Sequence, residues 1–219
     1  SGVLDVKSVI TRRFDIENAI DAYSLLDNPD ALGIVLNYPS QNQEILTKSK
    51  VELNNQTSKD IDSSTPCVGF IGAGNYASRT LIPAFKEAGA VLDTLVTSGG
   101  ISGVHHGNKN QFTTASTETN DLWNNDKINT VSIVTRHDAH AQQVVDALKS
   151  GKNVFVEKPL ALTLDELDVI DKTYHEANKS NTVRLMVGFN RRYAPHIVKM
   201  KELLNSHRSP KSIIMTVNA

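Results

Sequence analysis

The sequence predicts an α/β protein with a doubly wound parallel sheet and a small strand–helix–strand appendage at its start. Two observations predict this fold class. From residue 67 onward, short apolar segments alternate with segments of helical spacing, at about 25–30 residues per unit. Directly after the first apolar segment, the sequence Gly72-Ala73-Gly74-Asn75-Tyr76-Ala77 leads into a helical pattern. A strand, a glycine turn and a helix in that order are typical of the Rossmann type of sheet.

The composition excludes several classes of protein. The chain has 219 residues, 39% hydrophobic and 21% charged, which is typical of a globular protein. A net charge of −1 gives no argument for a surface that binds nucleic acid or anionic lipid. We see no apolar run long enough to span a bilayer and no signal peptide, and therefore expect a cytoplasmic protein without nucleic-acid or membrane partners. Cys67 is the only cysteine and opens an apolar run, so we expect it to be a small buried residue.

The first 66 residues divide into an appendage and a linker. In residues 1–39 we expect a strand at 6–10, a helix within 15–26 and a strand at 33–36. This part is too small to bury a core by itself. Residues 40–66 are polar and are predicted to be a linker, with a short helix around 44–53.

Residues 67–219 form the predicted nucleotide-binding domain. We expect strands at 67–71, 91–96, 130–134, 153–156, 183–187 and 211–217. We expect helices at 76–88, 118–125, 139–150 and 193–206, and one that begins near 163. Gly89 and Gly151 have the position of helix-ending glycines, and Thr163 with Glu166 has the spacing of a capping box. The polar, glycine-rich segment around His105 and His106 offers too few ligands for a metal, and we predict no metal site.

The residue types of the glycine loop suit a pyrophosphate. Gly72 permits a tight turn, Gly74 lets the backbone approach the phosphates, and Ala77 is small enough for close helix–strand packing. The helix that begins near Tyr76 presents free N–H groups and a partial positive charge. Ala73 and Asn75 complete the predicted cofactor-binding loop. The alternative is a plain glycine turn that binds no nucleotide.

The end of the second strand predicts which dinucleotide is bound. An acidic residue there accepts a hydrogen bond from the adenosine ribose and selects NAD. The sequence has Thr97 and Ser98 instead, which can bind a hydroxyl or a phosphate, and no arginine follows directly. Both NAD and NADP stay open, with NADP slightly favoured.

Three more segments follow predicted strands, where ligands bind in such sheets. They are residues 135–140 (Thr-Arg-His-Asp-Ala-His), residues 157–160 (Glu-Lys-Pro-Leu) and residues 188–193 (Gly-Phe-Asn-Arg-Arg-Tyr). Together with the glycine loop, these segments closely resemble the glucose–fructose oxidoreductase/inositol dehydrogenase (Gfo/Idh/MocA) family. The resemblance covers residues 67–219, and Glu157-Lys158-Pro159 is its most specific part.

The resemblance implies roles for individual residues. Lys158 would lie beside the nicotinamide and the substrate as a catalytic residue, in a turn shaped by Glu157 and by Pro159, a candidate cis proline. The other predicted cofactor-binding residues are Thr135, Arg136, His137, His140, Asn190 and Arg191. Oxidation of a sugar or polyol hydroxyl needs a base for the proton and a cation for the developing alkoxide, and Lys158 can supply the charge or part of a proton relay. The alternative for Lys158 is a solvated turn lysine.

Full-length members of the family carry a second domain that binds substrate, supplies a histidine and an aspartate for proton transfer and builds homo-oligomers. The chain stops where that domain would begin, so we expect a fragment with little turnover by itself. Two other functions stay open: a nucleotide-binding regulatory protein without catalysis, and a lyase or glycosidase of the same fold that uses NAD transiently. Residues 10–14, 19–26 and 33–36 resemble the C-terminal tail of a medium-chain, zinc-type alcohol dehydrogenase, and an unrelated extension is the alternative.

Overall fold

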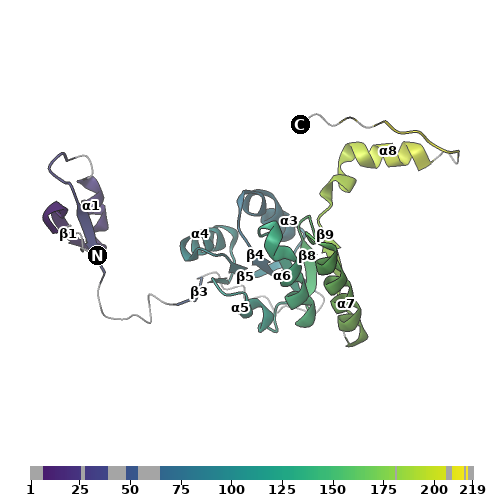
Figure 1. Ribbon diagram of the computed structural model, residues 1–219, viewed down its shortest axis with the longest axis horizontal. Coiled ribbons are helices and arrows are strands. Elements are labelled where there is room, and N and C mark those ends of the chain that lie inside the picture. Colours follow the sequence, from purple (N-terminus) through teal and green to yellow (C-terminus); the bar gives the residue numbers. More distant parts are fainter. Residues whose placement is uncertain are drawn as a thin grey trace. The chain divides into compact units, whose positions relative to one another are not determined.

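The computed structural model describes residues 7–25, 28–38, 48–53, 65–180, 182–205, 209–214 and 216. The chain divides into two compact units, Ser1–Lys48 and Ser49–Ala219. Figure 1 labels the elements of both, and each unit is described by itself.

The first unit contains the expected order of strand, helix and strand. Its strands β1 (Arg12–Asp15) and β2 (Ile34–Asn37) are parallel and are joined by α1 (Ala19–Ser24). The short helical turns η1 (Lys7–Val9) and η2 (Ile16–Asn18) flank β1. The strand predicted at 6–10 is wrong, because pairing begins only where the amides of Thr11 and Arg12 donate to the carbonyl of Gly33. The strand that forms is mostly charged, so hydrophobicity did not indicate it.

The second unit is built on a seven-stranded sheet in the order β3-β6-β5-β4-β7-β8-β9. These strands are β3 (Lys50–Glu52), β4 (Cys67–Ile71), β5 (Val91–Val96), β6 (Thr114–Ser116), β7 (Thr130–Ile133), β8 (Asn153–Val156) and β9 (Leu185–Val187). All pairs are parallel except β3 with β6. The chain builds outward from β4 in one direction through β5 and β6, and then in the other through β7, β8 and β9. The predicted doubly wound parallel sheet is confirmed.

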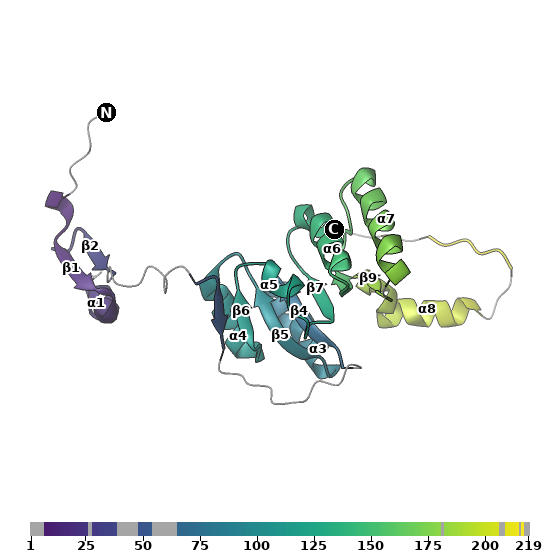
Figure 2. The same ribbon diagram turned by 90° about the horizontal axis from the view of Figure 1, so that it is seen from below.

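Both faces of the sheet are buried, as its apolar strands require. On β4, Cys67 and Ile71 pack with α6 (His137–Lys149), whereas Val68 and Phe70 pack on the opposite face with α3 (Ile82–Glu87). Figure 2 shows α3 and α4 (Gly100–Asn110) on one side of the strands and α5 (Asn120–Trp123) and α6 on the other. Cys67 is fully buried, as predicted.

The predicted helix ends are confirmed. Gly89 and Gly151 both have positive φ, and the amides that follow them donate back into α3 and α6. At the start of α7 (Leu164–Ser180), the amide of Glu166 donates to Oγ1 of Thr163, and the amide of Thr163 donates to the Glu166 carboxylate. These two bonds form the capping box. The last described elements are η4 (Asn190–Tyr193) and α8 (Pro195–Asn205).

Parts of the second unit differ from what the sequence predicted. Residues 50–52 form strand β3 and not a linker helix, because they pair with β6 and Leu53 packs against Gly107; residues 44–47 of that predicted helix lie outside the described residues. Helix α4 was not predicted. The strand predicted at 211–217 is wrong where the structure describes it, since residues 211–214 and 216 form no strand and Ile213 and Ile214 are exposed. Among the described residues, no helix is long and apolar enough to cross a membrane.

Candidate functional site

Two adjoining cavities lie at the carboxyl edge of the sheet. The larger has a volume of about 950 Å³ and the smaller of about 430 Å³, and both are lined by Gly74, Val134 and Thr135. The rest of the larger cavity is lined by Ile71, Gly72, Ala73, Val96, Thr97, Ser98, Ser102, Thr117, Thr119, Arg136, Asp138, Ala139 and Gln143. The rest of the smaller cavity is lined by Asn75, Tyr76, Ala77, His137, His140, Glu157, Lys158 and Asn190.

The larger cavity lies at the switch point of the sheet. Strand β4 is paired with β5 on one side and with β7 on the other, so the connections after β4 diverge there. Ligands of open α/β sheets bind in this crevice. A volume of this size accommodates a drug-sized or cofactor-sized ligand.

The glycine loop has the geometry that a pyrophosphate needs. Gly72 adopts φ of 101°, and a Cβ there would lie 2.6 Å from the carbonyl oxygen of Val134. A Cβ on Gly74 would meet nothing within 4 Å, because this glycine faces the open space of both cavities. Ala77 is buried against the sheet. The three small residues therefore serve a turn, a ligand approach and helix packing, and the loop fits a dinucleotide phosphate.

The helix after the loop begins with residues that line the smaller cavity, Asn75, Tyr76 and Ala77. The amide of Ser78 donates to the carbonyl of Gly74, and this is the first bond of the helix, so the amides before it lack a helical partner. The helix then passes through a π-helical segment, η3 (Ala77–Leu81), before α3. Pro83 lies in the first turn of α3 and has no N–H to donate, which explains the wider turn ahead of it.

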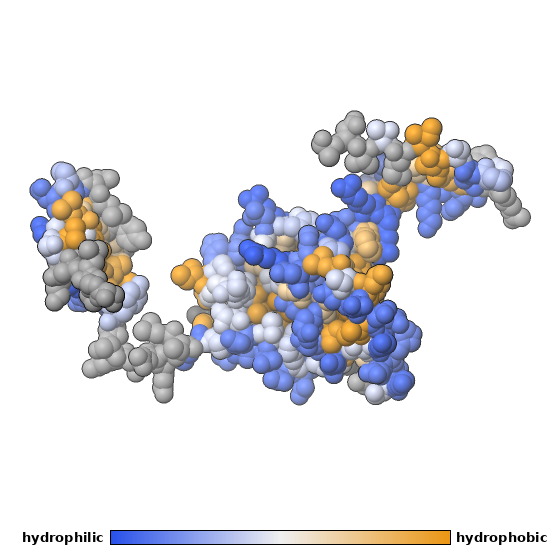
Figure 3. Space-filling view, in the orientation of Figure 1, coloured by the Kyte–Doolittle hydropathy of each residue, from blue (hydrophilic) through white to orange (hydrophobic). Residues whose placement is uncertain are grey.

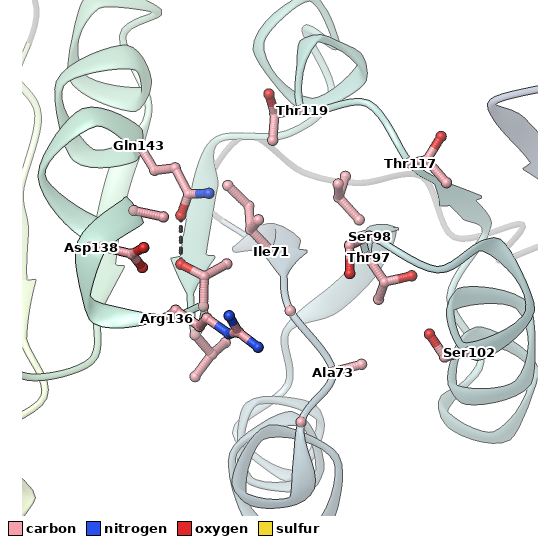
Figure 4. Close-up of a pocket in the computed structure, with 16 residues that line it drawn as sticks. Ile71, Ala73, Thr97, Ser98, Ser102, Thr117, Thr119, Arg136, Asp138 and Gln143 are labelled. Carbon is pink, nitrogen blue, oxygen red and sulfur yellow. Dashed lines mark hydrogen bonds between the residues drawn. The ribbon is translucent and has the colours of Figure 1, made fainter. Parts of the chain in front are cut away.

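Hydroxyl groups and one arginine also line the larger cavity. Oγ1 of Thr97 and Oγ of Ser102 each donate to the carbonyl of Gly99 at 2.8 Å, which leaves both oxygens able to accept. Figure 4 shows the Arg136 guanidinium pointing into the cavity from the segment after β7. Among the described residues that line this cavity, Asp138 is the one carboxylate, and it lies on α6 and not at the end of β5.

Side chains from four separate segments meet at the smaller cavity. Tyr76 comes from the glycine loop, His137 from the start of α6, Lys158 from the turn after β8 and Asn190 from η4. Nδ2 of Asn190 donates to the Tyr76 hydroxyl at 3.4 Å, which joins two segments 114 residues apart. Oε1 of Glu157 is buried and has no hydrogen-bond partner among the described residues. The cavity thus combines a cation with several groups that can bind hydroxyls.

His140 lies beneath this cavity and contacts two of its loops. Its side chain is fully buried. Its Nδ1 lies 2.7 Å from the carbonyl oxygen of Pro159, and its Nε2 lies 3.2 Å from the carbonyl oxygen of Thr135. The peptide bond between Lys158 and Pro159 is cis, as predicted.

The structure brings nearly all predicted site residues to one edge of the sheet. Pro159 lines neither cavity but contacts His140 through its carbonyl. Arg191 lies on η4, exposed, and lines neither cavity. Sequence reasoning missed the cavity residues Ser102, Thr117, Thr119 and Gln143, and it placed Asp138 in a ligand-binding segment without giving it a role. Only their position shortly after predicted strands or at the start of a predicted helix could have indicated them.

Three groups with shifted pKa values lie away from both cavities. Burial, with the charge of Asp93, raises the pKa of the Cys67 thiol to about 11. Burial lowers the pKa of Lys152, whose Nζ donates to the carbonyl of Asn125. Burial, with His105 and Lys109 nearby, lowers the pKa of His106. These groups belong to the packing of the sheet edge and of α4.

The fold and the glycine loop define a dinucleotide-binding α/β protein. A family model described as "Oxidoreductase family, NAD-binding Rossmann fold" (GFO_IDH_MocA) matches residues 67–189. The chain belongs to this family, which confirms the resemblance drawn from the glycine loop and the Glu157-Lys158-Pro159 turn.

Individual proteins similar to this chain are also named as oxidoreductases or dehydrogenases. Oxidoreductase P35 of Formosa agariphila is 34% identical over 140 residues, which cover 64% of this chain and 42% of the relative. An inositol 2-dehydrogenase/D-chiro-inositol 3-dehydrogenase of Lactiplantibacillus plantarum is 33% identical over 151 residues, covering 68% and 41%. The solved structure of an oxidoreductase domain protein from Kribbella flavida has a TM-score of 0.58 at 27% identity, covering 65% of this chain and 38% of that one. The chain spans about 41–42% of the length of these two curated relatives.

Proposed function

We propose that this chain supplies the nicotinamide-dinucleotide half of an oxidoreductase that acts on a sugar or polyol derivative. The observation that carries the proposal is the pair of adjoining cavities joined at Gly74, one beside the glycine loop and one beside Lys158. Such a pair allows one extended cofactor to place its phosphates at the loop and its nicotinamide near the lysine. The site residues proposed for this function are those of the sequence analysis, Arg191 and Pro159 included.

Lys158 is the proposed catalytic residue. A bound nicotinamide dinucleotide supplies the hydride acceptor or donor. The Lys158 ammonium would stabilise negative charge on the substrate oxygen as its proton leaves, and Asn190 and the Tyr76 hydroxyl would orient the substrate. The inositol dehydrogenase relative supports a polyhydroxylated substrate, because this cavity is lined by several groups that bind hydroxyls. The other groups of a proton relay would come from a second domain.

The larger cavity slightly favours NADP over NAD. No carboxylate follows β5, so nothing there would repel a 2′-phosphate or accept from a 2′-hydroxyl as an acid does. Arg136 points into the cavity and offers a cation, and Ser98 offers a hydroxyl. Thr97 would contribute less to binding the adenosine ribose or its phosphate than the sequence suggested. Its side chain is largely buried, and its hydroxyl donates to the carbonyl of Gly99.

The whole protein would be a cytoplasmic homo-oligomer, with the second domain adding the substrate and subunit contacts. The resemblance of the first unit to an alcohol dehydrogenase tail stays a prediction. Its parallel β1–α1–β2 order is compatible with that origin and with an unrelated extension.

Titration of the chain with NADPH and with NADH tests the proposal. We expect nucleotide fluorescence to change on binding, with dissociation constants below the millimolar range. Lys158→Ala should bind the cofactor within about threefold of the unchanged chain, because one exposed side chain at the nicotinamide end contributes little ground-state affinity. Absence of binding by both nucleotides would overturn the proposal.

A further inference from the structure

His140 lies between the Lys158–Pro159 turn and the segment at Thr135. It projects from the first turns of α6 and is fully buried, yet it borders the cavity that contains Lys158. The ring of His137, which also borders that cavity, packs edge-on against it at a centroid distance of 5.7 Å. The sequence suggested that His140 binds the cofactor, but a side chain without exposed surface has little to offer a ligand.

Both ring nitrogens of His140 face backbone carbonyls. Carbonyl oxygens only accept, so each contact needs a proton on the facing nitrogen. A neutral ring carries one N–H, and the shorter contact, 2.7 Å from Nδ1 to the Pro159 oxygen, assigns that proton to Nδ1. Nε2, at 3.2 Å from the Thr135 oxygen, then carries no proton and makes no hydrogen bond there.

These carbonyls belong to the two loops that the proposed chemistry must align. Thr135 lines both cavities, and Pro159 directly follows Lys158. Thr135 is also held by its side chain, since its Oγ1 donates to Oε1 of Gln143 on α6 at 2.8 Å. The first turns of α6 therefore hold the Thr135 segment through Gln143 and the Lys158 turn through His140.

We propose that His140 is a positioning residue, which fixes the Lys158 turn against the Thr135 segment through its Nδ1–H bond to Pro159 and does not contact the cofactor. The consequence for Lys158 rests on the proposed function. The bond itself does not, because it joins two residues of this chain.

Two substitutions separate the bond from the volume of the side chain. His140→Leu keeps an apolar group of similar size but has no donor. His140→Asn places an amide N–H near the position of Nδ1 and can restore donation to Pro159. His175→Leu, on the exposed surface of α7, serves as the matched control.

Amide hydrogen exchange, measured by NMR on the chain without cofactor, reports how firmly the Lys158–Pro159 turn is held. Glu157 and Leu162 flank the turn, and their amides are hydrogen-bonded to the Ile133 carbonyl and the Glu166 carboxylate. We expect both to exchange at least about tenfold faster in His140→Leu, and within about threefold of the unchanged chain in His140→Asn and His175→Leu. Gly72 and Ser78 should exchange alike in all four proteins.

Cofactor titration then distinguishes positioning from binding. We expect the NADPH dissociation constant of His140→Leu to change less than about threefold, while the NADPH-induced shift of the ¹³C-methylated Lys158 amine signal is lost. A tenfold loss of affinity with unchanged exchange at Glu157 and Leu162 would show instead that His140 contacts the cofactor. Equal exchange in His140→Asn and His140→Leu would overturn the role of the hydrogen bond.

Two further comparisons test the role of His140 if a variant does not fold or if no dinucleotide binds. If His140→Leu does not fold, His140→Asn is compared with His140→Gln, whose longer side chain places its donor away from Nδ1, and equal exchange in the two overturns the proposal. If no dinucleotide binds to the unchanged chain, the proposed function fails, whereas the exchange data still decide whether His140 fixes the turn.

Discussion

The two cavities at the carboxyl edge of the sheet are built in different ways. The wall of the larger cavity at the glycine loop is mostly backbone, and its shape depends on the absence of side chains at Gly72 and Gly74. The smaller cavity is lined by long side chains, Tyr76, Lys158 and Asn190, from segments far apart in the sequence. Ligand binding in the larger cavity should therefore be weakened by substitutions that add a side chain. Function at the smaller cavity should be weakened by substitutions that remove one.

The largest effect is expected from filling the larger cavity at Gly74. Gly74→Val adds a side chain where nothing lies within 4 Å, so the folded protein has room for it. The same space would hold the cofactor phosphates, and we expect cofactor affinity to fall at least about 100-fold, about 2.7 kcal/mol. Fluorescence titration gives the affinity, and thermal unfolding should shift by no more than a few degrees. Unchanged affinity would mean that the phosphates do not approach this loop.

Gly72→Ala should act on the fold and not only on the ligand. Its φ of 101° is strained for any L side chain, and the added Cβ would lie 2.6 Å from the Val134 oxygen. We expect the free energy of unfolding to fall by about 2 kcal/mol, measured by urea denaturation. Gly89→Ala is the matched control, because it has a similar φ of 88° without any neighbouring atom within 4 Å. Equal losses in the two variants would remove the close approach to β7 as a cause.

Local signals explain why the sequence could predict much of the second unit. The glycine loop, the helix-ending glycines and the Thr163–Glu166 capping box each require particular residues at short spacing. Helix α4 has no such signal. Gly103 and Gly107 weaken a helix intrinsically, but a Cβ on either would crowd Thr97 or Leu53, so close packing on the sheet determines the helix. Strand β3 likewise exists only through its pairing with β6. The hydrogen bonds of His140 are long-range contacts, which spacing cannot predict.

Apolar residues after β8 show the same limit. Figure 3 shows hydrophobic surface over α8, where Val198, Met200 and Leu203 are exposed. No described residue of α8 is buried, although its apolar spacing predicted a helix correctly. The predicted strand at 211–217 was apolar as well, yet Ile213 and Ile214 are exposed and belong to no strand among the described residues. Hydrophobic spacing thus indicates a tendency, which a packing partner must complete.

Cys67, at the amino edge of the sheet, offers a contrast to both cavities, because its side chain has no exposed surface. Burial raises the pKa of Cys67 to about 11 from an ordinary value of 9.0, so the folded state holds the thiol proton more tightly than the unfolded state. The stability that this provides is complete below pH 9 and is lost as the pH rises toward 11. At pH 10.5 we expect a loss of about 2 kcal/mol relative to pH 8.

Urea denaturation of the unchanged chain and of Cys67→Ala at several pH values tests this. The alanine variant should be less stable near neutral pH because a buried sulfur is missing, and the difference between the two proteins should shrink above pH 9. A constant difference up to pH 10.5 would contradict the raised pKa.

The smallest effect is expected at Arg136, whose guanidinium points into the larger cavity in Figure 4. A guanidinium recognises a phosphate through several N–H donors, whereas a ribose hydroxyl gains little from it. Arg136→Ala should weaken NADPH binding about tenfold and NADH binding less than about threefold. The NADPH affinity should also lose part of its dependence on salt, because an exposed ion pair is screened. Arg184→Ala, outside both cavities, is the matched control. If the affinities for both nucleotides fall equally, Arg136 contacts a part that NADPH and NADH share, and the preference for NADP rests on Ser98.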